Sequence, residues 1–281
     1  MRNGFYPFQT GSFECFALCD GDLDYSLESM VTNAPPSDVE VYLQAHGLRT
    51  DIINTPFTYL YVDTGKHKIL VDMGAGNLFP TTGRLLQSMD QAGISPEIID
   101  GIFISHAHPD HVGGALNESG EPIFSNATYY ICQNEWDFWF SEQVIHQVAE
   151  TFITFARQKL TPIKERTLLI EKEKEILPGV EVIFAPGHTP GHMVVSFKSE
   201  GAQLLYTADT VLHPLHLERP DWLPSYDILP ELASMSKNLI FDLAAATKSL
   251  VLGQHFPPFP NLGHITKKEI GWLWQPIETE P

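Results

Sequence analysis

A cluster of three histidines and one aspartate fills positions 106 to 111 and constrains the fold more than any other feature of the sequence. The mostly apolar residues 98–105 precede it and are predicted to form a buried strand. Gly113 and Gly114 follow it and allow backbone segments to approach closely. We therefore expect the cluster on a loop between a strand and a helix, where open α/β sheets bind ligands.

The four side chains are of the kind that binds divalent transition metals, because neutral imidazole and carboxylate are common zinc ligands. In an extended segment, His106 and His108 project the same way, whereas Asp110 and His111 fall on the following turn and can face a second ion. A polar surface loop with a chance histidine cluster is the alternative, and the strand-end context disfavours it. We interpret the cluster as the first half of a two-metal site.

Three more residues of metal-ligand type follow predicted strands in the second half of the chain. His188 follows a strand at 180–185, Asp209 a strand at 203–207, and His255 a strand at 249–252. Four strand ends thus supply all the expected ligands, an arrangement that chance does not readily produce. The expected ligands are His106, His108, Asp110, His111, His188, Asp209 and His255.

Length and charge limit the protein class. The chain has 281 residues, 43% of them hydrophobic, which suffices for a large core. No linker or low-complexity tract divides it, so we expect a single domain over residues 1–281. A formal net charge of −18 disfavours nucleic acid as a partner, because polyanions would be repelled.

Cysteine usage and hydropathy bear on the compartment. Cys15, Cys19 and Cys132 do not make a disulfide framework, which favours a reducing compartment. Cys15 and Cys19 are four residues apart in a predicted strand and should share a buried face. The N-terminus shows no apolar signal region and no run of about 18 apolar residues occurs. We expect no membrane contact and a cytoplasmic location.

The local patterns predict alternating strands and helices. A strand at 13–19 should close at the turn formed by Asp20 and Gly21. A helix at 37–47 should begin with Ser37 as its N-cap, and Asn134 should cap a later helix. Further predicted elements are a hairpin of strands at 55–62 and 68–71, helices at 83–93, 143–159 and 228–246, and strands at 129–132 and 193–197. The mixed-sign residues 171–175 are expected to be solvated.

Residues 133–175 are predicted to form a helical insertion, and two roles are open for it: a cover over the site or part of the core. Aromatic side chains at helical spacing are more often core than pocket wall, yet an insertion between ligand segments is where a substrate lid would lie. The side chains expected to line a substrate pocket are Trp136, Phe138, Trp139, Phe140, His213 and Phe256.

The order of the ligand-type residues resembles the metallo-β-lactamase superfamily, whose pattern is H-x-H-x-D-H followed by a distant His, Asp and His. The resemblance covers residues 13–275 and implies an α+β fold, an αββα four-layer sandwich of two facing mixed β-sheets flanked by helices. It also implies the division of ligands: His106, His108 and His188 would bind the first metal, Asp110, His111 and His255 the second, and Asp209 would bridge both.

Two details bear on the branch of the family. Residues 255–264 are similar to the ending of methyl parathion hydrolase-like enzymes, a group that includes lactonases and arylesterases, although Asn261 stands where glycine is usual. The best-known acyl-homoserine lactonases carry a tyrosine three residues after the bridging aspartate, and Leu212 replaces it here. Asp72 matches an early aspartate motif of the superfamily that supports a metal ligand without binding the metal.

The resemblance implies a hydrolase with two divalent metal ions per chain, zinc first and manganese or iron as alternatives. A hydroxide bridging the ions would cleave a small apolar ester or lactone, with organophosphates as side substrates, and Asp110 or Asp209 would carry the proton. A thioester hydrolase of the glyoxalase II type, a mononuclear iron oxygenase and a non-catalytic scaffold are the alternatives. The expected partner is a small molecule, and a homodimer is left open.

Overall fold

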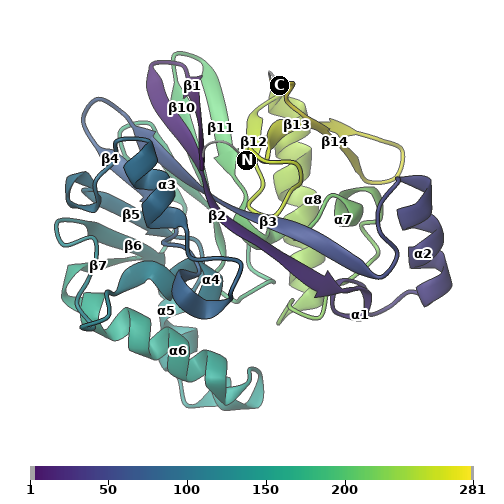
Figure 1. Cartoon of the computed structure of the whole chain (residues 1–281), viewed down its shortest axis with the longest axis horizontal. Coiled ribbons are helices and arrows are strands. Elements are labelled where there is room, and N and C mark those ends of the chain that lie inside the picture. Colours follow the sequence, from purple (N-terminus) through teal and green to yellow (C-terminus); the bar gives the residue numbers. More distant parts are fainter. Residues whose placement is uncertain (1–3, 280–281) are drawn as a thin grey trace.

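The computed structural model describes residues 4–279 and contains two seven-stranded β-sheets that face each other, with helices on the outer sides (Figure 1). The αββα sandwich expected from the resemblance is therefore confirmed. A hydrophobic cluster between the sheets takes residues from both, including Cys15 and Phe103 from the first and Val195 and Phe197 from the second. The two sheets therefore share one hydrophobic core.

The first sheet holds the N-terminal half of the chain in strand order β1-β2-β3-β4-β5-β6-β7. Its first four strands pair antiparallel, and β4 to β7 pair parallel, so several strands end at the same edge. The bounds are β1 Phe5–Thr10, β2 Phe13–Ser26, β3 Ile52–Asp63, β4 Lys68–Val71, β5 Gly101–Ile104, β6 Thr128–Cys132 and β7 Thr167–Ile170.

The second sheet holds the C-terminal half in the order β14-β13-β12-β11-β10-β9-β8. Its strands pair antiparallel except for the parallel pair β11 and β12, which brings their carboxyl ends together. The bounds are β8 Lys174–Leu177, β9 Val180–Phe184, β10 Met193–Ser199, β11 Ala202–Tyr206, β12 Leu250–Leu252, β13 Leu262–Lys267 and β14 Trp272–Pro276.

Helices cover the outer faces of the two sheets (Figure 1). The α-helices are α1 Leu27–Met30, α2 Pro36–Ala45, α3 Leu85–Gln91, α4 Pro109–Val112, α5 Gln133–Phe140, α6 Glu150–Leu160, α7 Leu215–Glu218 and α8 Pro230–Thr247. The 3-10 helices are η1 Gly76–Leu78, η2 Pro96–Ile98, η3 Gly113–Ala115, η4 Gln143–His146, η5 Thr161–Arg166 and η6 Ala208–Thr210. In the part of the chain that the structure describes, no helix is long and apolar enough to cross a membrane.

The predicted turn at Asp20 and Gly21 is wrong. Strand β2 continues through these residues to Ser26, with a register shift between Cys19 and Gly21. Gly21 has a φ of +134°, and a Cβ there would lie 2.0 Å from the carbonyl oxygen of Thr81. The Asp-Gly pair therefore marks a β-bulge, where glycine allows a close backbone approach, and not the end of the strand.

Two predicted helix caps are also wrong, although both helices exist. Helix α2 begins at Pro36, and the cap position is Pro35, so proline geometry starts the helix instead of the Ser37 hydroxyl. Asn134 lies inside α5, whose cap residue is Cys132. The expected burial of Cys15 and Cys19 is confirmed, and the solvated run 171–175 is exposed.

The bulge places the carboxylate of Asp20 where it ties β2 to two other segments. Its oxygens accept hydrogen bonds from the backbone N–H groups of Ala75 (3.0 Å) and Leu85 (2.7 Å), and the side chain is fully buried. Asp20 thus holds the loop after β4 and the start of α3.

We predict that Asp20→Ala lowers the free energy of unfolding by about 2–4 kcal/mol, because it leaves two buried N–H groups without a partner. Urea denaturation measures the change. Asp38→Ala on the exposed start of α2 is the control and should change stability by less than about 0.5 kcal/mol. Equal stability of the two variants would show that the Asp20 contacts contribute little.

Candidate metal centre

The predicted ligand residues meet at one edge of the two sheets. The loop after β5 carries His106 and His108, and Asp110 and His111 lie in the single-turn helix α4 that follows. His188 follows β9, Asp209 lies in η6 directly after β11, and His255 follows β12. Their side chains form two adjacent groups, called the metal-type groups below, with Asp209 in both. The strand-end placement expected from the sequence therefore holds in three dimensions.

The first group consists of His106, His108, His188 and Asp209. His108 Nδ1 lies 3.0 Å from His106 Nε2 and 2.9 Å from His188 Nε2. Asp209 Oδ2 lies 3.2 Å from His188 Nε2 and 3.8 Å from His106 Nε2. Three ring nitrogens and one carboxylate oxygen thus face a common point.

The second group consists of Asp110, His111, His255 and the other oxygen of Asp209. Asp110 Oδ2 lies 3.3 Å from His111 Nε2 and 3.5 Å from His255 Nε2. Asp209 Oδ1 lies 3.5 Å and 3.3 Å from the same two nitrogens. Each carboxylate oxygen is therefore almost equidistant from both imidazoles.

Both groups fit a divalent ion. Ligand atoms at about 2.0–2.1 Å from a tetrahedral zinc ion are separated from one another by about 3.3 Å, close to the distances in the second group. In addition, His111 Nε2 and Asp209 Oδ1 are buried and have no hydrogen-bond partner among residues 4–279. Buried polar atoms without partners are rare, so these two indicate a missing partner at that point.

Burial and neighbouring charges set the protonation states of the site. Burial alone would lower the pKa of His188 and His255, but the Asp209 carboxylate outweighs it and raises both pKa values to about 9, so these rings bind a metal by releasing a proton. Burial, and then the neighbouring charge of His111, holds the pKa of His106 well below its usual range, so the ring is neutral. Burial alone would raise the pKa of Asp209, but His255 and His111 outweigh it and hold that pKa well below the usual carboxyl range. A neutral imidazole and an ionised carboxylate are the forms that bind a metal.

Carboxylates behind the rings fix their orientation. Asp72 accepts hydrogen bonds from the N–H (2.7 Å) and hydroxyl (2.7 Å) of Ser105 and lies 2.8 Å from His111 Nδ1. This placement supports the role expected for Asp72. Asp227, which the sequence patterns did not single out, lies 3.0 Å from His188 Nδ1. Such partners set the tautomer and the direction of a ligating imidazole.

Glu135 of α5 is a second positioning residue that the sequence patterns missed. It is fully buried, and Oε1 accepts hydrogen bonds from Ala107 N (2.9 Å) and Trp139 Nε1 (2.7 Å). Its Oε2 accepts from the Thr189 hydroxyl (2.6 Å) and Gly191 N (3.0 Å). Glu135 therefore joins the loop of His106 and His108 to the loop of His188. The sequence signal was only an acidic residue in an aromatic helix, and Asp137 shares it.

A cleft of about 580 Å³ opens onto the two groups. His108, Asp110 and Asp209 line it together with residues of β2, η1 and α6. Helix α6 contributes Phe152 and Phe155, so part of the insertion at 133–175 does border the site.

None of the six side chains expected in the substrate pocket lines this cleft. Trp139 is fully buried and bonds Glu135, while Trp136 and Phe138 pack against the core beneath α5. Phe140 stacks on Trp136, with ring centroids 4.6 Å apart. His213 is buried and accepts from Leu215 N, and Phe256 is buried in the core of the second sheet. Helix α5 turns Trp139 into the core, while Trp136 and Phe138 are half-buried and Phe140 is exposed, so none of its aromatic residues faces the cleft.

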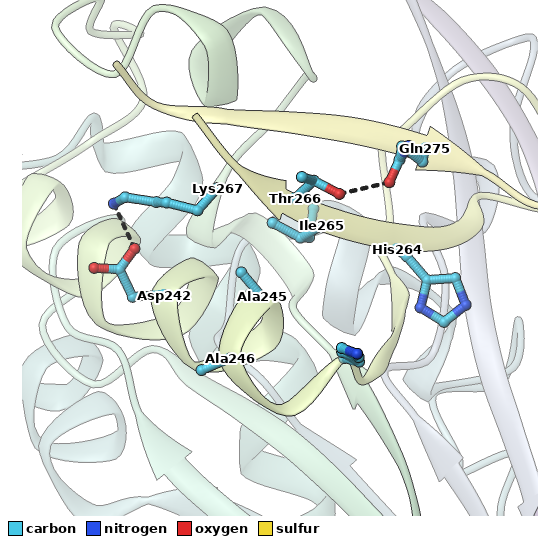
Figure 2. A pocket seen from close by; sticks show the side chains of 9 residues that line it. Asp242, Ala245, Ala246, His264, Ile265, Thr266, Lys267 and Gln275 are labelled. Atoms are coloured by element: carbon cyan, nitrogen blue, oxygen red, sulfur yellow. Dashed lines mark hydrogen bonds and ion pairs between the residues drawn. The ribbon is translucent and has the colours of Figure 1, made fainter. Parts of the chain in front are cut away.

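A second hollow, of about 750 Å³, lies between α8 and β13 (Figure 2). Lys267 pairs with Asp242 there, and the Thr266 hydroxyl donates to Gln275 Oε1. No member of either metal-type group lines it, so it is separate from the candidate centre.

Residues 55–255 match the family model described as the metallo-beta-lactamase superfamily, and the chain belongs to this family. An N-acyl homoserine lactonase of Bacillus thuringiensis is 24% identical over 228 residues, which cover 73% of this chain and 82% of the relative.

Two solved structures share nearly the whole chain. AidC, described as a dizinc quorum-quenching lactonase in complex with a product, has a TM-score of 0.94 and 29% identity over 99% of both chains. The hydrolase AbOPH has a TM-score of 0.91 and 28% identity over 99% of both chains. With the paired His and Asp groups, these likenesses define a metal-dependent hydrolase with a site for two divalent ions.

We predict that the purified protein saturated with zinc binds two ions per chain and that Asp209→Ala binds one at most, because both groups use this carboxylate. Elemental analysis gives the count. Asp51→Ala, at an exposed position, is the control and should keep both ions. Two tightly held ions in Asp209→Ala would exclude a shared carboxylate.

We further predict that Glu135→Gln lowers kcat and the affinity for one ion by about tenfold to a hundredfold. Glutamine offers one acceptor oxygen, so its amide group would meet two of the four donors. Steady-state kinetics and zinc titration measure these effects, and Glu142→Gln on the exposed part of the insertion is the control. Wild-type values for Glu135→Gln would remove Glu135 from the positioning of the site.

Proposed function

We propose that this protein hydrolyses the ring ester of N-acyl homoserine lactones. The observation that carries the proposal is a largely apolar cleft that opens onto the two metal-type groups and that no lysine or arginine of residues 4–279 lines. The names of the relatives, which are lactonases of this substrate class, support it.

The cleft is suited to an uncharged molecule with an apolar portion. Leu23, Leu78, Phe79 and Leu212 line it together with the aromatic residues of α6. Within the described chain, no lysine or arginine lines this cleft. A substrate with free carboxylates, such as a glutathione thioester or a β-lactam, would lack a cationic partner there. A lactone with an apolar acyl chain carries no charge that needs one.

We assign a role in the reaction to each side chain of the two groups. When bound, two divalent ions would lower the pKa of a water toward about 7 and polarise the ester carbonyl. The proposed holders of the first ion are His106, His108 and His188, and those of the second are Asp110, His111 and His255. Asp209 spans both groups, with one oxygen in each.

We assign the proton transfer to Asp110. Each oxygen of Asp209 faces one of the two groups, whereas Asp110 faces the second group with Oδ2 alone, and Oδ1 of Asp110 has no hydrogen-bond partner in residues 4–279. Asp110 also lines the cleft, and its side chain is 15% exposed compared with 5% for Asp209. Oδ1 of Asp110 is therefore placed to accept a proton and to return it to the leaving alcohol oxygen.

The other readings are weaker on specific grounds. A mononuclear iron oxygenase would need only the first group, and the second group is equally well formed. A non-catalytic scaffold would not need orphaned buried atoms aimed at a common point. Uncharged organophosphate triesters stay a proposal as side substrates, because they suit the same apolar cleft.

Three finer expectations stay proposals. Zinc is proposed as the native metal, which the dizinc relative supports. A cytoplasmic location is supported by three free, buried cysteines. A homodimer is left open.

We predict that the zinc-loaded protein prefers an N-acyl homoserine lactone with an apolar acyl chain, with kcat/KM at least about tenfold above that for a glutathione thioester, a β-lactam or an aryl phosphotriester. Titration of released acid or a chromogenic assay of each compound gives the ranking. A higher kcat/KM for any competitor would refute the substrate assignment.

The same assay tests Asp110. We expect Asp110→Asn to lower kcat for the lactone by about a hundredfold or more, because general acid–base catalysis contributes about 10²–10⁴. Asp24→Asn, at another carboxylate of the cleft, is the matched control and should retain kcat within about threefold. Loss of equal size in both variants would contradict the role of Asp110.

A further inference from the structure

His192 is a fully buried histidine next to the first metal-type group that belongs to neither group. Its ring centroid lies 5.1 Å from that of His106 and 6.0 Å from that of His188. The residue precedes β10, and its backbone oxygen accepts from Ala185 N (2.9 Å). The backbone of His192 is therefore fixed, and its ring lies beside two expected metal ligands without being a ligand itself.

One nitrogen of this ring contacts the backbone of the shared carboxylate residue. The N–H of Asp209 donates to His192 Nε2 over 3.1 Å. Because Nε2 accepts, the ring proton must reside on Nδ1. Nδ1 is buried and has no hydrogen-bond partner in the described part of the chain.

This arrangement is unfavourable for stability alone. A buried N–H without an acceptor has a desolvation cost that an apolar side chain of similar size would avoid. The contact to Asp209 is thus the one polar interaction of the ring that could justify a histidine here. The observation points to a role in the site and not in the core.

The backbone that carries Asp209 depends on such a contact. Ala208 has a φ of +42°, in the left-handed region that non-glycine residues seldom adopt. Asp209 itself has φ −94° and ψ 21°, outside helical geometry. An unusual conformation of this kind persists only where surrounding contacts hold it, and the bond to His192 is the contact made by the Asp209 N–H.

We propose that His192 is a positioning residue whose Nε2 lone pair fixes the backbone of Asp209 so that each carboxylate oxygen faces a different metal-type group. This inference goes beyond the proposed substrate and concerns occupancy of both groups. It holds or fails whether or not a homoserine lactone is hydrolysed.

The test compares His192→Leu with His192→Gln. Leucine fills the space but accepts no hydrogen bond, whereas the glutamine carbonyl can replace Nε2 as the acceptor. We expect His192→Leu to weaken binding of the second ion by about tenfold to a hundredfold in a zinc titration. In the manganese(II)-loaded protein, electron paramagnetic resonance should show loss of the exchange coupling between the two ions. His192→Gln should stay closer to wild type in both measurements.

His216→Leu is the matched control. His216 is equally buried, has one ring nitrogen bonded to a backbone oxygen and the other unpartnered, and belongs to neither metal-type group. Its replacement should leave metal affinity and exchange coupling unchanged. Thermal melts should show a smaller loss of stability for His192→Leu in the metal-free protein than in the zinc-loaded protein, because the leucine leaves only the Asp209 N–H unpaired when no ion is bound.

Three results would overturn the proposal. The first is wild-type metal affinity and coupling in His192→Leu. The second is an equal loss in His192→Gln and His192→Leu, because the acceptor would then not matter. The third is a metal-free His192→Leu protein that is destabilised as much as the loaded one, which would make His192 a structural residue.

Discussion

Burying several histidines and aspartates with their lone pairs aimed at common points is the constraint on which the rest of this structure depends. Without partners, such groups would be costly to remove from water. In several of these side chains, one polar atom contacts a neighbouring residue that holds the side chain in place. The other polar atom points to the place where the ligand atoms converge. Asp72 and Asp227 serve His111 and His188 in this way. The Pro56 carbonyl lies 3.1 Å from His255 Nδ1.

The two sheets make this convergence possible because the strands that precede the ligands end at the same edge. Loops that leave strands at one edge need little extra chain to bring side chains together, so precision comes from contacts between loops. Glu135 is the main such contact, because a single carboxylate receives hydrogen bonds from both ligand loops of the first group. The insertion therefore supports the metal centre through Glu135 of α5, although no aromatic residue of α5 lines the cleft.

Much of the site could be predicted from sequence, because ligand chemistry and strand ends are both local signals. All seven ligand-type residues converge as expected, and Asp72 lies beside His111. The substrate pocket could not be predicted, because the face that a helix turns to the cleft depends on how it packs on its sheet. Trp139 and Phe152 have similar hydrophobicity, yet the first is core and the second borders the cleft. The bulge at Gly21 was missed because Asp-Gly also signals turns.

Part of the cleft wall and the metal ligands belong to different structural elements. The histidines and aspartates stand on loops tied to strand ends, whereas Phe152 and Phe155 belong to a helix that contributes no ligand. Substitutions on the side of α6 that borders the cleft can therefore change the size and shape of the cleft while the metal ligands stay as they are. A fold with this separation can acquire new selectivity by small steps, without passing through forms that have lost their chemistry.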